Sequence, residues 1–290
     1  MTILKRGLLL AVLSLGLQPA QSKQPDTSAE PARVAEAAFY ALEANPWDGE
    51  IIGQAVKDLV RAYESAPTDP WVLVGISRAL LAQGYIKGDR ADLSSYEADK
   101  VAAALDFANR AVKHGDSNSM AHVALARMQI ITKNERGAWD SLNRAYSLDP
   151  QAFYPWYYRA VVSLKMRDYK RGADALREAE SRATMKYQKE WVVGRMINVA
   201  ELTNNVQEQE TYYKKTIELS PTDATSYGNY ALFLKTHKRY DEAITFYKKA
   251  ISIRPYGLAV EQLKQTELLR DAARQQQQLF EADRAKTKGS

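Results

Sequence analysis

The feature that most constrains this fold is a pair of small residues, seven positions apart, that recurs along the chain. In the stretch DEAITFYKKAISIRP the pair is Ala243 and Ala250, and Pro255 follows it. The first members of the successive pairs are Ala55, Ala104, Ala138, Gly172, Gln209 and Ala243. The steps between them are 49, 34, 34, 37 and 34 residues. An internal period of this size indicates stacked structural repeats.

Each repeat also has a second apolar segment upstream of its small pair. Ala126, Ala160 and Ala231 lie in three such segments, and large apolar residues surround them at a helical period. A short polar turn separates the two segments of a repeat, and a proline often follows the second one. Small residues let two helices approach closely where they cross, and proline ends a helix. The sequence therefore predicts a series of antiparallel helix pairs.

The sixth repeat carries a set of residues at characteristic spacings: Tyr227, Ala231, Leu234, Tyr240, Ala243, Tyr247, Ala250 and Pro255. With these residues the chain resembles the tetratricopeptide repeat family, whose units are 34-residue helix-turn-helix pairs. The resemblance covers residues 36–257 and is weaker in the fifth repeat, where Gln209 and Thr216 replace the small pair. It implies an all-α, right-handed superhelical solenoid of about six repeats.

The two ends of the chain differ from the repeats. Residues 1–22 have the pattern of a cleaved signal peptide, because Lys5 and Arg6 precede an apolar run over residues 7–17. An uncleaved membrane anchor is the alternative, although this run is short for a bilayer. We expect residues 23–35 to be a flexible lead-in and residues 258–290 to form a capping helix with a polar tail. The mature protein should be periplasmic or secreted, without a membrane span.

The composition does not favour catalysis, a metal site or a cofactor. The chain has no cysteine and three histidines, none at metal-ligand spacing, and it lacks a glycine-rich phosphate loop. We therefore expect a protein that is not an enzyme and has no cofactor. The net charge of +5 falls to +3 without Lys5 and Arg6, which gives no reason to expect nucleic acid as a partner.

The step of 49 residues between Ala55 and Ala104 includes an insertion at residues 82–100. Insertions in repeats often project from one face and bind partners. The other interpretation is a tolerated insertion in which Tyr85 and Tyr96 pack on the repeats. The sequence leaves both interpretations open.

The family resemblance implies that the first helices of the repeats line a concave groove that holds partner peptides. The residues expected to face this groove are Tyr154, Tyr157, Val161, Trp191, Arg127, Arg195, Asn198 and Asn229. Tyr154, Tyr157 and Trp191 could instead pack against the next repeat or the C-terminal helix. The expected function is a non-enzymatic scaffold or adaptor for another protein. By analogy it would serve envelope assembly, secretion or polysaccharide export. A carbohydrate-binding solenoid, or an enzyme with an unrecognised site, is the alternative.

Overall fold

The computed structural model describes residues 31–288, and within that range the chain contains thirteen α-helices, one short 3₁₀ helix and no strand. The all-α prediction is confirmed. The predicted signal peptide and the first part of the lead-in lie outside the described residues. No helix among the described residues has both the length and the apolar character needed to cross a membrane.

The chain divides into two compact units, with the boundary after Ala183. The described helices of unit 1 are α2 (Pro31–Ala44), α3 (Gly49–Ser65), α4 (Pro70–Gln83), η1 (Leu93–Ser95), α5 (Ala98–His114), α6 (Ser119–Ile131), α7 (Glu135–Leu148), α8 (Phe153–Lys165) and α9 (Tyr169–Arg182). Those of unit 2 are α10 (Lys186–Leu202), α11 (Val206–Leu219), α12 (Ala224–Thr236), α13 (Tyr240–Ile253) and α14 (Gly257–Lys288).

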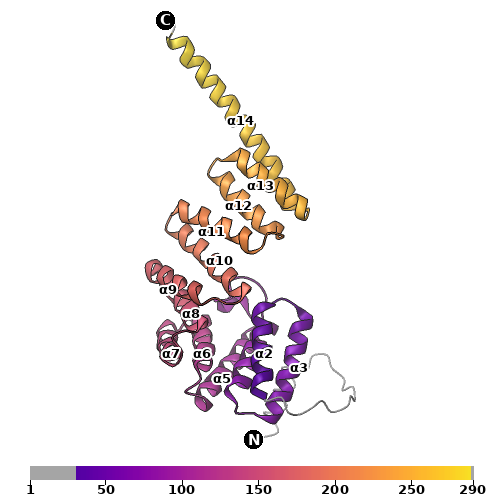
Figure 1. Cartoon of the computed structure of the whole chain (residues 1–290), viewed down its shortest axis with the longest axis vertical. Helices are drawn as coiled ribbons and strands as arrows, with labels where there is room; N and C mark the ends of the chain where they lie inside the picture. Colours follow the sequence, from indigo (N-terminus) through magenta and orange to yellow (C-terminus); the bar gives the residue numbers. More distant parts are fainter. Residues whose placement is uncertain (1–30, 289–290) are drawn as a thin grey trace. The chain divides into compact units, whose positions relative to one another are not determined.

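Consecutive helices pack as pairs, from α2 with α3 to α12 with α13 (Figure 1). The six pairs confirm the helical repeat solenoid. In unit 1 the first helices α2, α4, α6 and α8 also contact one another in sequence order. Successive repeats of unit 1 are therefore joined along their first helices.

The small residues of the repeat lie where the helices cross. Ala104, Ala138 and Ala243 are fully buried. At Gly75 in α4, an added Cβ would lie 2.4 Å from Cδ2 of Leu59 and 3.3 Å from the carbonyl oxygen of Ala35. The small residues are needed because these contacts leave no room for a larger side chain.

In four of the repeats, the turn between the two helices has a residue in the left-handed backbone conformation at the same position of the turn. Lys133, Arg167, Asn204 and Lys238 have φ between 54° and 61°. Such a residue ends a helix, and at three of these turns the next residue is Asn or Asp, whose side chain caps the following helix. The turn geometry therefore recurs with the repeat.

The fifth repeat packs differently from the others. Gln209 is the one buried residue of α11, and its Nε2 donates a hydrogen bond of 3.1 Å to the carbonyl oxygen of Ala200 in α10. A polar contact thus holds the helices where other repeats use two small residues.

Two expectations about the chain's organisation are refined by the structure. Helix α2 begins at Pro31, so the part of the expected flexible lead-in at residues 31–35 is helical and that part of the prediction is wrong.

The insertion forms a folded loop between α4 and α5, in which Tyr85 and Tyr96 form an isolated β-bridge. Tyr96 is buried, and Asp92 of this loop forms an ion pair with Lys165 of α8. These contacts favour the packed interpretation of the insertion.

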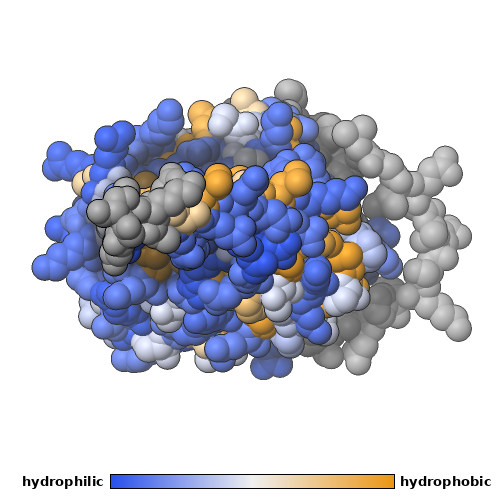
Figure 2. Space-filling view, turned by 90° about the horizontal axis from the view of Figure 1, so that it is seen from above, coloured by the Kyte–Doolittle hydropathy of each residue, from blue (hydrophilic) through white to orange (hydrophobic). Residues whose placement is uncertain are grey.

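Helix α14 begins as a cap on the last repeat. Ala259 and Thr266 of α14 are buried, and α14 contacts α13 and α12 of the last repeat. Further along, Leu279 is 63% exposed and Phe280 is 67% exposed, where the helix runs beyond α13 (Figure 1). On the face seen in Figure 2, hydrophobic residues form separate patches among hydrophilic ones.

Candidate functional site

The aromatic residues expected to face an open groove are covered in unit 1. Tyr154, Tyr157 and Val161 of α8 are each less than 10% exposed. The ring of Tyr154 lies 5.7 Å from that of Phe39 and 6.4 Å from that of Tyr40, both in α2. The expectation of an accessible surface is therefore wrong for these three residues, because all three are buried and α2 covers Tyr154. Tyr154 packs on the first repeat, and not on the next repeat or the C-terminal helix as the alternative had it.

Arg127 is also buried, and it belongs to a cluster of charged residues around one carboxylate. This Glu43 cluster consists of Glu43, Arg78, Arg90 and Arg127. The Glu43 side chain is fully buried, and its Oε1 accepts hydrogen bonds from Nη1 of Arg127, at 2.7 Å, and from Nε of Arg78. Arg90 of the insertion lies 3.7 Å from the other carboxylate oxygen. The cluster joins α2, α4, α6 and the insertion.

Electrostatics keeps the Glu43 cluster charged. Burial alone would raise the pKa of Glu43, but the charges of Arg78, Arg127 and Arg90 lower it to about 2. Burial lowers the pKa of Arg78 to about 10, against the opposing effect of Glu43. Both groups are ionised at neutral pH. Three guanidinium groups therefore share a single buried carboxylate.

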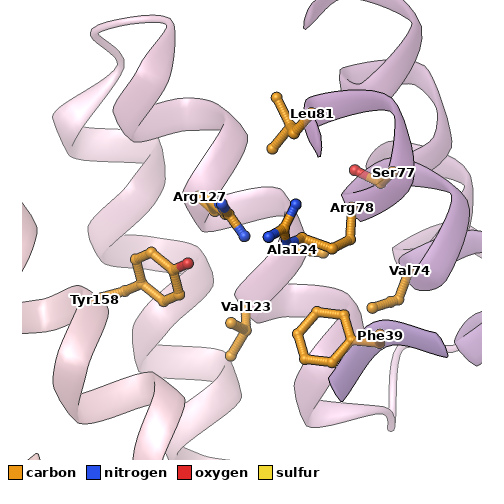
Figure 3. Close-up of a pocket in the computed structure, with 9 residues that line it drawn as sticks. All are labelled: Phe39, Val74, Ser77, Arg78, Leu81, Val123, Ala124, Arg127 and Tyr158. Atoms are coloured by element: carbon orange, nitrogen blue, oxygen red, sulfur yellow. The ribbon is translucent and has the colours of Figure 1, made fainter. Parts of the chain in front are cut away.

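A small cavity lies beside this cluster, as Figure 3 shows. Arg78 and Arg127 reach into it, and the ring of Tyr158 faces them across the gap. Its volume is about 10 Å³, which is room for about one water molecule. This cavity cannot admit a partner's side chain, so the Glu43 cluster is a structural clamp between repeats.

The other predicted contact residues belong to unit 2. Trp191, Arg195 and Asn198 follow one face of α10, where the first two are half-buried and Asn198 is exposed. Asn229 of α12 is exposed as well. The structure thus leaves these four residues reachable, and their role in binding stays a prediction.

Unit 1 has an open cleft that the sequence reasoning did not find. Its volume is about 670 Å³, and side chains of α7, α8 and α9 line it. The residues lining the cleft are Trp139, Asn143, Trp156, Arg159, Arg171, Asp174, Ala175, Arg177 and Glu178. We refer to it as the Trp139–Trp156 cleft.

Arg159 lies among the aromatic rings of this cleft. Its Cζ is 4.7 Å from the ring centre of Tyr146, 5.3 Å from that of Trp156 and 5.6 Å from that of Trp139. Such distances allow cation–π attraction. Nη2 of Arg159 donates a 2.6 Å hydrogen bond to Oδ1 of Asn143. The guanidinium is therefore held in a fixed position at the wall of the cleft.

The charge of Arg159 has no carboxylate partner among the described residues, and its buried Nε has no hydrogen-bond acceptor there. Burial lowers its pKa. The two acidic residues at the cleft, in contrast, each form an ion pair with an arginine. Asp174 pairs with Arg177 at 2.7 Å, and Glu178 pairs with Arg182 at 2.6 Å. The cleft therefore has an uncompensated cation.

The cleft and the buried cluster are on opposite sides of α8. With 3.6 residues per turn, Trp156 and Arg159 point away from the face that carries Tyr154 and Tyr158. The sequence reasoning followed the small residue Ala160 and the groove face, and so passed over the residues between them. Trp156 precedes Ala160 by four residues and lies on the same side of α8, so the sequence pattern places it among the residues around that small position. No pattern in the sequence singles out Arg159.

Metal-ligating side chains do not cluster among the described residues. No group of three or more His, Asp or Glu side chains among them could hold a metal ion. His122 is buried, and its Nε2 lies 2.9 Å from the carbonyl oxygen of Asp116.

Comparison with protein families matches one repeat of the chain. Residues 212–245 match the family model of the tetratricopeptide repeat, and this stretch runs from α11 into α13. No curated protein sequence gives a significant match. Residues 212–245 therefore match one tetratricopeptide repeat, and the other helix pairs of the described residues share its helix-turn-helix form.

Solved structures share the fold at low sequence identity. PilW, a type IV pilus biogenesis factor, has a TM-score of 0.58 and 11% identity, with 80% of this chain and 98% of that chain covered. PilF of Pseudomonas aeruginosa has a TM-score of 0.53 and 14% identity, covering 81% of this chain and 98% of that one. A chain of the Cut9–Hcn1 hetero-tetramer of APC/C has a TM-score of 0.56 and 14% identity, covering 82% of this chain and 46% of that one. At these identities the likeness shows the fold alone.

Proposed function

We propose that this chain is a non-enzymatic scaffold that holds a segment of another protein. The observation that carries the proposal is the open Trp139–Trp156 cleft, whose tryptophan and arginine side chains are the types that dominate binding energy in protein interfaces. In unit 2, Trp191, Arg195, Asn198 and Asn229 are proposed as a further contact surface, as the family resemblance implies.

We also propose that the protein works in an exported compartment after removal of residues 1–22. The pattern of Lys5, Arg6 and the following apolar run supports this step. The role of PilW in pilus biogenesis supports envelope assembly as the setting by analogy only.

Carbohydrate binding is less well supported by the cleft. Sugar rings stack on open aromatic faces, but arginines already occupy the rings of this cleft. Arg171 lies 5.5 Å from the ring centre of Trp139, and Arg182 lies 5.1 Å from that of Trp156. A sugar ring stacked flat on a tryptophan would compete with these guanidinium groups for the ring face. An apolar side chain needs only the surface of the half-buried rings that stays exposed, and a carboxylate beside it can pair with Arg159.

A photocrosslinking experiment in cells tests the scaffold. A photoreactive residue is placed at Asn143 in the cleft, at Asn198 in unit 2, or at the control position Asp106, which is exposed on α5 and outside both surfaces. We expect a protein adduct from Asn143 or Asn198 that is missing from Asp106. Adducts of equal yield at all three positions, or none at the first two, would contradict the proposal.

Export is tested separately on the same cells. Amino-terminal sequencing of the purified chain should start at Lys23, and the protein should fractionate with exported proteins. An intact N-terminus on protein retained inside the cell would contradict export while leaving the scaffold proposal intact.

A further inference from the structure

We propose that the Trp139–Trp156 cleft binds an acidic segment of a partner protein, with a carboxylate on Arg159 and a neighbouring apolar side chain against the tryptophans. This inference rests on the proposed function and adds the place of binding and the chemistry of the partner. It assigns binding in unit 1 to the side of α8 that faces away from the Glu43 cluster.

The charge of Arg159 is unmet within the described part of the chain. Asn143 takes one hydrogen bond from Nη2, and neither Nη1 nor Nε has an acceptor among the described residues. Three aromatic rings shield the guanidinium from part of the solvent. A carboxylate is the ligand that supplies both the missing charge and the missing acceptors, since arginine binds carboxylates through paired hydrogen bonds.

The rim of the cleft carries charges of both signs. The residues lining the cleft include three arginines (Arg159, Arg171 and Arg177) and two acidic residues (Asp174 and Glu178), a balance of +1. A polyanion such as nucleic acid would place repeated negative charges against these acidic residues. A peptide with one or two carboxylates avoids that repulsion, so the rim favours a protein segment.

The size of the cleft suits a short protein segment. A volume of about 670 Å³ falls within the usual range of ligand sites, about 300–1,000 Å³, and suffices for several side chains. Trp139 and Trp156 are half-buried and contribute apolar surface to the wall. An aliphatic or aromatic residue next to the carboxylate would bury this surface.

Among the described residues, the adjacent pair of large apolar side chains with the greatest exposure is Leu279 and Phe280, and it does not fit the cleft. Leu279 and Phe280 of α14 are exposed, but residues 274–288 contain four basic and two acidic residues. A second copy presenting this segment would bring net positive charge to a cleft of net positive charge. We therefore assign the cleft to a different protein.

Selection from a displayed library of random dodecapeptides tests the inference on the full mature chain. The enriched peptides are synthesised and titrated by tryptophan fluorescence against the wild type, Arg159→Gln and Arg144→Ala. Glutamine at position 159 removes the charge but keeps a long side chain. Arg144 is a matched control on α7, since it pairs with Asp116 and does not line the cleft. Circular dichroism confirms that each variant is folded.

We expect enriched peptides that carry Asp or Glu beside an apolar residue. Arg159→Gln should weaken their binding at least about tenfold, as expected for loss of a charge-assisted hydrogen bond, whereas Arg144→Ala should bind like the wild type. Replacing the acidic residue of the peptide by its amide should weaken binding to the wild type similarly. Peptides that lack acidic residues, binding that Arg159→Gln leaves unchanged, or no enrichment at all would overturn the inference. In the second of these cases the chain still binds peptides, so the scaffold proposal would survive.

Discussion

Glu43 in α2 and Arg127 in α6 form a buried ion pair of 2.7 Å across 84 positions of the sequence. The pair joins the first repeat to the third, and Arg78 of the second repeat contacts the same carboxylate. Glu43 therefore connects three successive repeats of unit 1. Its loss would leave three buried or half-buried arginines without their shared counter-ion.

The first prediction concerns the Glu43→Gln variant. Breaking a buried ion pair by removing one partner costs about 3–5 kcal/mol, because the remaining charges stay buried and uncompensated. We expect a decrease of this order in the free energy of unfolding, measured by urea denaturation. Glu64→Gln is the control, since Glu64 is exposed on α3, and it should change stability by less than about 0.5 kcal/mol. Equal effects of the two substitutions would show that the cluster is not a clamp.

The second prediction is the pH dependence of stability. The pKa of Glu43 is about 2 in the folded chain, against a usual value of 4.5. A carboxylate with a lowered pKa stabilises the fold above its unfolded pKa, and this stabilisation is lost as the pH falls towards the folded value. Unfolding free energy should therefore decrease between about pH 4.5 and pH 2. The decrease should be smaller in Glu43→Gln than in the wild type, and parallel curves for the two proteins would contradict the assignment.

The third prediction uses the left-handed turns. Lys238 is exposed and has φ of 61°, a conformation that glycine adopts without a steric penalty. Lys238→Gly should stabilise the chain by about 0.5–1 kcal/mol in thermal unfolding. The matched control is Lys249→Gly, in the middle of α13, which should destabilise it by about 1 kcal/mol. If both substitutions destabilise equally, the turn does not require the left-handed conformation.

The fourth prediction compares two glycines in helices. Gly75→Ala places a methyl group against the buried side chain of Leu59 and should destabilise the chain by about 1–3 kcal/mol. Gly53→Ala meets no atom within 4 Å and should stabilise α3 by about 0.5–1 kcal/mol. Opposite signs in calorimetry are the expected result, and a neutral Gly75→Ala would show that the helices can separate there.

The fold was predictable because packing at helix crossings repeats with the sequence. Ala104, Ala138 and Ala243 each mark a contact between neighbouring helices, so a local pattern specifies a long-range arrangement. The start of α2 at Pro31 was less predictable. Ala35 and Ala38 are buried by contacts that a local composition rich in proline and polar residues does not reveal.

The site was harder to predict for a physical reason. The family resemblance identifies which face of α8 looks towards the expected groove, but exposure depends on what packs there, and α2 covers Tyr154. Likewise, arginine is a residue type that often binds partners, and only the short distance from Arg127 to Glu43 shows that this arginine has a structural role. The Trp139–Trp156 cleft lies between helices of two repeats, α7 of the third and α8 and α9 of the fourth. The pattern within one repeat therefore does not reveal it.

Radical footprinting of the chain, with and without the partner that photocrosslinking captures, tests the central claim most directly. The claim is that binding in unit 1 uses the cleft and not the covered aromatic face. Oxidation of Trp139 and Trp156 should decrease when the partner is bound, while Tyr154 and Tyr157 stay unreactive in both states. If Trp139 and Trp156 react equally with and without the partner, and protection appears only elsewhere on the chain, the assignment of the cleft is contradicted.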